Sequence, residues 1–306
     1  MLNYDLKEEN ILIIIFVILL KLFKILKNHN LNKKVINNFS YVRLSLLIPP
    51  LLLFFIFVLF FIKDGAFDVN EYIEIQKDLF FQLNSSLSKL PVLQLNLTQL
   101  GDPLILLPLL TVFIIYAPKL WHTVLTSSII SGLLSFFLKK LFAVPRPAAV
   151  LDNDTFIIIG RNIASTHSSL PSGHSIITFT IITILLFAFM PKGLKSKIFW
   201  TFSILILGLI IAFSRVGVGA HFPLDVVIGS TIGFISALIG IFINNNISFK
   251  SYYNIKIYHP IVLLFLIVWI FLIINKIIAN NLLIFYFPLL TLIITLYLTR
   301  VYYAKK

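Results

Sequence analysis

The chain has 306 residues, of which 59% are hydrophobic and only 12% are charged. A typical soluble domain is about 45–50% apolar and about 25% charged, so this composition excludes ordinary soluble, disordered and collagen-like proteins and leaves a polytopic helical membrane protein. The chain has no cysteine, which excludes disulfide scaffolds, thiolate zinc sites and cysteine nucleophiles, and its net charge of +13 has to be interpreted from where the charges lie.

Hydrophobic runs near membrane-spanning length recur along the chain. An apolar run at 11–20 continues into Lys21, Lys24 and Lys27, and this 11–27 segment either spans the membrane or lies along its surface as a basic amphipathic helix. Eight further runs follow, at about 46–62, 103–118, 121–141, 174–190, 198–214, 224–243, 260–275 and 282–299. The sequence therefore predicts an all-α transmembrane bundle with eight or nine spans.

The longest connection between these runs, 63–102, is acidic, and we expect it to hold a short surface helix in a solvated connector. Its acidic residues are Asp64, Asp68, Glu71, Glu74, Asp78 and Asp102.

The positions of the charges predict the orientation of the runs. If successive runs alternate across the bilayer, fifteen cations fall on one side and all twelve acidic residues fall on the other. Cytoplasmic loops of membrane proteins carry an excess of Lys and Arg, so we expect the basic side to be cytoplasmic. The fifteen cations are Lys21, Lys24, Lys27, Lys33, Lys34, Arg43, Lys119, Lys192, Lys195, Lys197, Lys250, Lys256, Arg300, Lys305 and Lys306.

Another set of ionisable residues lies at the ends of apolar runs, on the side opposite the basic loops. Ionisable groups at membrane depth are costly and usually functional. The set falls into three groups: Lys139 with Arg146-Pro147, Pro171-Ser172-Gly173-His174, and Ser214-Arg215 with His221 and Asp225.

Each group alone has a structural explanation, as an interfacial cation pair, a helix N-cap or a structural His–Asp pair. Together they offer three cations, a helix N-terminus and two histidines, and His221 lies about one helical turn from Asp225. Cations and backbone N–H groups stabilise a phosphoryl group. A histidine with an orienting carboxylate suits a nucleophile, and His174 suits a general acid.

The spacings Lys139-x6-Arg146-Pro147, Pro171-Ser172-Gly173-His174 and Ser214-Arg215-x5-His221-x3-Asp225 resemble the three signature motifs of the type-2 phosphatidic acid phosphatase superfamily. The resemblance implies a six-helix, membrane-embedded phosphatase core at 46–243. An N-terminal hydrophobic and basic segment (1–45) and two additional C-terminal transmembrane helices (244–306) would flank this core.

The resemblance also implies a role for each motif residue. His221 would attack phosphorus and form a phosphohistidine, Asp225 would orient His221, and His174 would protonate the leaving oxygen and then activate water. The residues implied to hold the phosphate oxygens are Lys139, Arg146, Ser172, Gly173 and Arg215. Neither a metal nor another cofactor is expected, and the partners are membrane lipids and a lipid phosphate, with no nucleic acid.

The implied function is an integral plasma- or inner-membrane phosphatase of the cell envelope, with its site on the periplasmic or extracellular side. Undecaprenyl diphosphate, phosphatidylglycerophosphate, phosphatidic acid and lipid A 1-phosphate stay open as substrates, with a slight preference for a polyprenyl diphosphate.

Other functions and other site residues stay open as alternatives. A lipid phosphotransferase would use the same site, whereas the intact His174, His221 and Asp225 argue against a non-catalytic lipid-binding protein. The position of the ionisable groups at helix ends argues against a transporter. His167 is a candidate for a headgroup contact, and Arg161 for a contact with a second phosphate or an anionic lipid. A zinc site built from His167, His174, His221 and Asp225 would leave the three motif cations unexplained.

Overall fold

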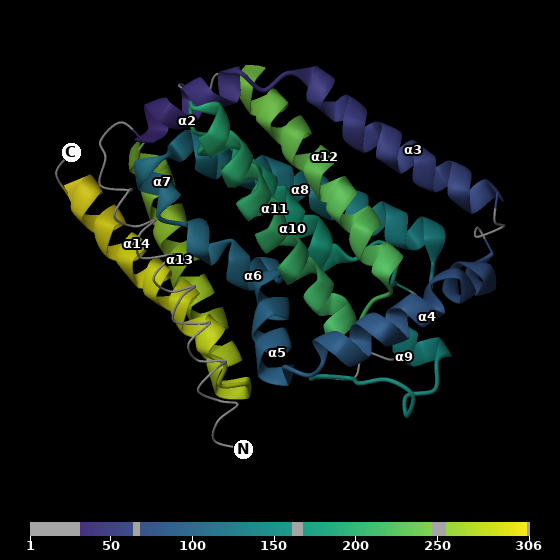
Figure 1. Cartoon of the computed structure of the whole chain (residues 1–306). Coiled ribbons are helices and arrows are strands. Elements are labelled where there is room, and N and C mark those ends of the chain that lie inside the picture. Colours follow the sequence, from purple (N-terminus) through teal and green to yellow (C-terminus); the bar gives the residue numbers. More distant parts are fainter. Residues whose placement is uncertain (1–30, 64–67, 161–167, 247–254, 305–306) are drawn as a thin grey trace.

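A computed structural model of the chain describes residues 31–63, 68–160, 168–246 and 255–304 (Figure 1). Every regular element in these ranges is a helix, which confirms the predicted all-α class. The apolar run at 11–27 lies outside the described residues, as do Arg161 and His167.

Four helices form the centre of the bundle: α8 (Pro118–Phe142), α10 (Gly173–Ala188), α11 (Leu194–Gly217) and α12 (Pro223–Asn246). Most residues of α10 are buried, because α10 contacts the other three helices. Glycines let α12 approach α10 closely. A Cβ at Gly229 would lie 2.7 Å from the Ser172 carbonyl oxygen, and a Cβ at Gly233 would collide with the Ile176 carbonyl oxygen. This close packing fixes the N-terminus of α10 against the first turns of α12.

The N-terminal described segment closes the end of the bundle where the basic loops lie. α2 (Leu31–Ser40) buries Leu31, Val35 and Phe39, which recur every four residues, and is followed by η1 (Leu44–Leu47) and the largely exposed α3 (Ile48–Lys63). Asn38 Nδ2 donates to the Ala188 carbonyl oxygen at 2.9 Å. The axis turns by 77° between α2 and the following helix.

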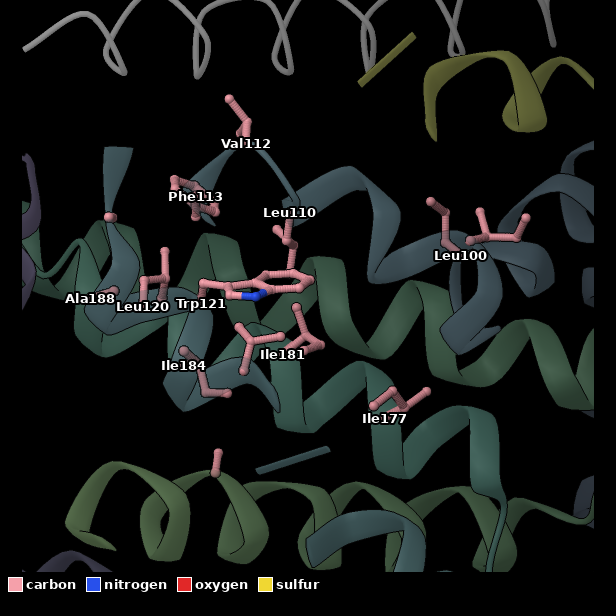
Figure 2. Close-up of a cluster of buried hydrophobic side chains, with 14 of the residues drawn as sticks. Leu100, Leu110, Val112, Phe113, Leu120, Trp121, Ile177, Ile181, Ile184 and Ala188 are labelled. Atoms are coloured by element: carbon pink, nitrogen blue, oxygen red, sulfur yellow. The ribbon is translucent and has the colours of Figure 1, made fainter. Parts of the chain in front are cut away.

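The predicted run at 103–118 is not one continuous helix, although the segment joins Asp102 at the motif end of the bundle to Lys119 at the basic end. It consists of α6 (Pro103–Leu106), η2 (Pro108–Leu110) and α7 (Phe113–Tyr116). Pro108 lacks an N–H group and restricts the residue before it, so a continuous helix cannot pass through this position without losing hydrogen bonds. The run is apolar because it is buried in the protein: Figure 2 shows Trp121 of α8 between Leu110 and Ile181.

Two C-terminal helices cover this broken segment. α13 (Ile255–Ala279) is followed by η4 (Leu283–Phe285) and α14 (Tyr286–Ala304), and α13 and α14 lie side by side along one edge of the bundle, opposite α3 (Figure 1). Trp269 Nε1 donates to the Leu104 carbonyl oxygen at 3.1 Å, and the hydroxyls of Thr111 and Thr295 are 3.0 Å apart.

The described residues contain fewer membrane-length helices than the eight or nine spans expected. By length and composition, five helical stretches could cross a membrane, or six if the bent pair α2–α3 counts as one span. The difference arises because 103–118 is broken and because α10, with 16 residues, is shorter than a typical span. The five stretches are Pro118–Val150, Leu194–Gly217, Pro223–Asn246, Pro260–Ala279 and Leu283–Val301.

The expectation of a solvated connector at 63–102 is wrong. Its two helices, α4 (Val69–Leu87) and α5 (Pro91–Leu100), contact α11, and α4 also contacts α12 (Figure 1). α4 buries a stripe of residues with helical spacing, and the buried Phe80 stacks edge-on with Phe222, which directly follows His221. The connector therefore forms part of the wall around the motif residues. The buried residues of α4 are Tyr72, Ile73, Gln76, Phe80 and Asn84.

Candidate active site

The predicted pairing of His221 with Asp225 is present and completely buried. Pro223 begins α12, where its missing N–H group costs nothing. This start places Asp225 in the first turn and His221 just before the helix, with His221 Nδ1 3.3 Å from Asp225 Oδ2. The side chains are 1% and 0% exposed. Because Nδ1 faces the carboxylate, Nε2 is the ring nitrogen left for chemistry.

Three further donors hold the Asp225 carboxylate in place. The Tyr72 hydroxyl donates to Oδ1 at 2.7 Å, and the Ser169 hydroxyl and the Phe222 N–H group donate to Oδ2 at 2.5 and 2.9 Å. A buried carboxylate needs such donors because burial without them is strongly unfavourable. With its oxygens fixed, Asp225 can hold the imidazole of His221 in one orientation.

Tyr72 and Ser169 are not among the residues that the sequence predicted, because each lies far along the chain from Asp225. The Tyr72 position is fixed by α4, where Gln76 Nε2 donates to the Tyr72 carbonyl oxygen and Gln76 Oε1 accepts from the Leu224 N–H group. One signal was available: polar and aromatic residues recur every four positions through α4, which is typical of a helix face that is buried. No comparable pattern marks Ser169.

The PSGH group forms the N-terminus of α10, as predicted. Ser172 is the N-cap, and its hydroxyl accepts from the Ser175 N–H group at 3.4 Å and from the Ser175 hydroxyl at 2.9 Å. His174 lies in the first turn and is half-buried. The turn after α5 presses against it, because a Cβ at Gly101 would lie 2.9 Å from His174 Cβ.

The three motif cations surround this helix end. Lys139, in the last turn of α8, donates to the Ser168 carbonyl oxygen at 3.0 Å, and a Cβ at Gly173 would lie 3.9 Å from its Nζ. Arg215 Nη1 donates to the Thr98 hydroxyl at 2.6 Å. Arg146 Nε and Nη1 and Arg215 Nε are buried without a hydrogen-bond partner among the described residues. Such buried donors call for a ligand, and guanidinium groups suit phosphate oxygens.

Burial and the same cations favour the neutral form of His221. Burial, with the positive charges of Arg215, Arg146 and Lys139, lowers the pKa of His221 well below its ordinary value. Its imidazole is therefore neutral at physiological pH, which leaves a lone pair for nucleophilic attack. Burial and the Asp225 charge raise the pKa of Tyr72, so its hydroxyl keeps the proton that it donates.

A cavity of about 250 Å³ opens onto part of this site. Arg146, His174 and Arg215 line it, together with Asp102 and Lys276, so three of the predicted site residues share one cavity. The described residues contain no group of three or more His, Cys, Asp or Glu side chains placed as metal ligands. His167, one ligand of the zinc alternative, lies outside the described residues.

Comparison with known proteins finds a family model that spans these motif residues, a related protein and a similar solved structure. A family model of the PAP2 superfamily matches residues 120–248, which contain all three motif groups. An undecaprenyl-diphosphatase from Sulfolobus acidocaldarius is 30% identical over 198 residues, which are 62% of this chain and 89% of that protein. The crystal structure of Aquifex aeolicus LpxE is similar with a TM-score of 0.43 and 28% identity, and the match covers 55% of this chain and 94% of that one.

Proposed function

Because this chain belongs to the PAP2 superfamily, we propose that it is an integral membrane phosphatase that removes a phosphate from a lipid phosphate or diphosphate through a phosphohistidine. The observation that carries the proposal is the cavity in which buried, unpartnered arginine donors face His174, next to the buried His221–Asp225 pair. An anion with several oxygens fits these donors.

In the proposed reaction, the neutral His221 attacks phosphorus with Nε2. A nitrogen–phosphorus bond forms as the bond from phosphorus to the leaving oxygen breaks, and His174 gives its proton to that oxygen. Bound phosphate adds negative charge beside His174, which favours the protonated imidazole needed for this step. His174 then takes a proton from water, the water oxygen attacks phosphorus, and inorganic phosphate leaves His221.

The positive groups stabilise charge during both steps. We assign the equatorial phosphate oxygens to Lys139, Arg146 and Arg215 and to backbone N–H groups of Ser172 and Gly173 at the N-terminus of α10. The hydrogen bond that Arg215 Nη1 donates to the Thr98 hydroxyl orients that guanidinium. Asp225 stabilises the positive charge that develops on His221.

Phosphate release from a panel of lipid phosphates tests this function directly. We expect the purified full-length protein in detergent to hydrolyse at least one of farnesyl diphosphate, phosphatidic acid and phosphatidylglycerophosphate. Activity should survive exhaustive EDTA treatment, because three cations already supply the charge that a divalent ion would bring. Activity that EDTA removes and zinc or magnesium restores would contradict the metal-independent mechanism, and product bound to an acceptor other than water would identify a phosphotransferase.

We further propose that the site faces away from the cytoplasm. Lys119 lies at the end of the bundle that α2 closes, where its backbone N–H group donates to Asn32 and its side chain to the Asn244 carbonyl oxygen. The motif residues lie at the other ends of α8, α10 and α12. Basic loops favour the cytoplasm, so the site should be periplasmic or extracellular.

Single cysteines test this sidedness, since the chain has none of its own. Asn153 is exposed beyond α9 (Pro147–Val150), near the motif end, and Ser196 is exposed in the first turn of α11, at the basic end. In intact cells whose outer membrane, if any, is permeabilised, an impermeant maleimide should label Asn153→Cys. Ser196→Cys should react only after lysis, and the reverse pattern would place the site in the cytoplasm.

Tyr72→Phe should lower kcat about tenfold with little change in KM, because Asp225 loses one of the donors that fix it. The measurement is steady-state phosphate release, with Tyr41→Phe as a control, since Tyr41 is 72% exposed beside α2. A lower Tm with unchanged kcat would show that Tyr72 only stabilises the fold.

A further inference from the structure

One wall of the cavity contains an ion pair that the reaction described above does not use. Lys276 of α13 donates to Asp102 Oδ2 at 2.6 Å, and both residues line the cavity with Arg146, His174 and Arg215. The two side chains are partly exposed, at 29% for Lys276 and 18% for Asp102. Lys276 is therefore a fourth cation beside the motif cations, and a solute in the cavity can reach it.

The ion pair lies close to the proposed general acid. Asp102 directly follows Gly101, where an added Cβ would lie 3.2 Å from Cδ2 of the His174 ring. Thr98, one helical turn earlier, holds Arg215. The segment that carries Asp102 thus contacts both His174 and Arg215. In the proposed reaction His174 protonates the leaving oxygen, so Lys276 lines the same cavity as the group that meets the leaving oxygen.

Asp102 balances the positive charge of Lys276. Its other carboxylate oxygen makes a separate hydrogen bond. Its Oδ1 accepts from the Leu104 N–H group at 2.8 Å and caps α6. A phosphate group offers Lys276 more acceptor oxygens and more negative charge than one carboxylate. Asp102 can therefore give up Lys276 to a phosphate and still keep its capping contact.

We propose that Lys276 binds the second phosphate of a lipid diphosphate, the one that stays on the lipid, and so makes the enzyme favour diphosphates over monophosphates. The proposal rests on the proposed function. In this reaction the bond from His221 to the terminal phosphorus forms, the bond to the bridging oxygen breaks, and His174 protonates that oxygen. The leaving group is a lipid monophosphate, whose charge Lys276 stabilises. Lys276 lies beyond the 120–248 match, so it is separate from the motif residues that would bind the terminal phosphate.

Two substrates with the same tail test the proposal: farnesyl diphosphate and farnesyl monophosphate, with the full-length protein in detergent. Lys276→Met should lower kcat/KM for the diphosphate by about tenfold to a hundredfold, as expected for a lost hydrogen bond between charged groups. The monophosphate value should change by less than about threefold, and Lys276→Arg should restore most of the diphosphate activity. Lys77→Met is the matched control, because Lys77 pairs with Glu74 at 2.9 Å on the exposed face of α4.

Asp102 variants separate a direct contact from an indirect one. Asp102→Asn keeps a good N-cap but removes the competing charge, so KM for the diphosphate should stay the same or fall. Lys276→Met alone leaves the Asp102 carboxylate without its partner near Arg215, and the double variant Asp102→Asn/Lys276→Met removes that charge as well. The double variant should still lose the preference for the diphosphate.

Equal losses for the two substrates in Lys276→Met, or an unchanged preference, would overturn the proposal while leaving the phosphatase function standing. If the wild-type protein hydrolyses neither farnesyl substrate, calorimetric binding of inorganic pyrophosphate and orthophosphate decides the inference, and the panel of lipid phosphates decides the proposed function separately. Lys276→Met should then lose the preference for pyrophosphate, and a preference equal to that of the wild type would refute the second-phosphate site.

Discussion

Replacement of His221 by alanine should lower phosphate release by at least about 10⁴-fold and leave no covalent phosphoenzyme. The nucleophile and the residues that orient it act together, so removing the nucleophile alone abolishes most of the catalysis that they provide. His221 is 1% exposed and held against Asp225, whose other contacts are to Tyr72, Ser169 and the Phe222 N–H group.

The measurement is a rapid acid-free quench with a ³²P-labelled substrate, which preserves an acid-labile phosphohistidine. His122→Ala is the matched control, because His122 is a half-buried histidine near Lys119 at the opposite end of the bundle. It should keep its phosphoenzyme. If His221→Ala protein still accumulates labelled phosphohistidine, the nucleophile is a different residue and the role assigned to His221 is wrong.

Hydrophobic runs predicted the central helices well. The runs 198–214 and 224–243 correspond to α11 and α12, each a few residues longer than its run. Hydropathy reports the free energy of moving side chains from water into an apolar environment. It does not report whether the backbone can continue as a helix. The run 103–118 is therefore apolar yet broken at its prolines, and it is covered by α13 and α14.

The motif residues could be selected from the sequence because their chemistry and spacing are local. His221 and Asp225 are four residues apart, and Ser172 to His174 form one helix start. Other parts of the site depend on contacts between distant segments, which no spacing reveals. Tyr72 and Asp225 are separated by 153 positions, and Asp102 and Lys276 by 174.

His174→Ala should affect the two halves of the reaction differently. Forming the phosphoenzyme from an alkyl phosphate should slow by about 10²- to 10⁴-fold, because a poor alkoxide leaving group needs a proton as the bond breaks. With p-nitrophenyl phosphate the same step should slow far less, since p-nitrophenolate is stable as an anion. Breakdown of the phosphoenzyme should slow equally for both substrates, because the intermediate is the same and His174 activates the water.

Steady-state rates would hide this contrast when breakdown limits turnover, so the first turnover has to be resolved by stopped-flow or quenched-flow measurement. His174→Ala should give a burst of p-nitrophenolate equal to the enzyme concentration, followed by very slow turnover, and no burst with octyl phosphate. The phosphoenzyme should accumulate on His221 during the slow phase. Gly101 offers an independent check: Gly101→Ala places a Cβ against His174, so it should reproduce the pattern more weakly. Equal loss of the first turnover for both substrates would exclude His174 as the general acid.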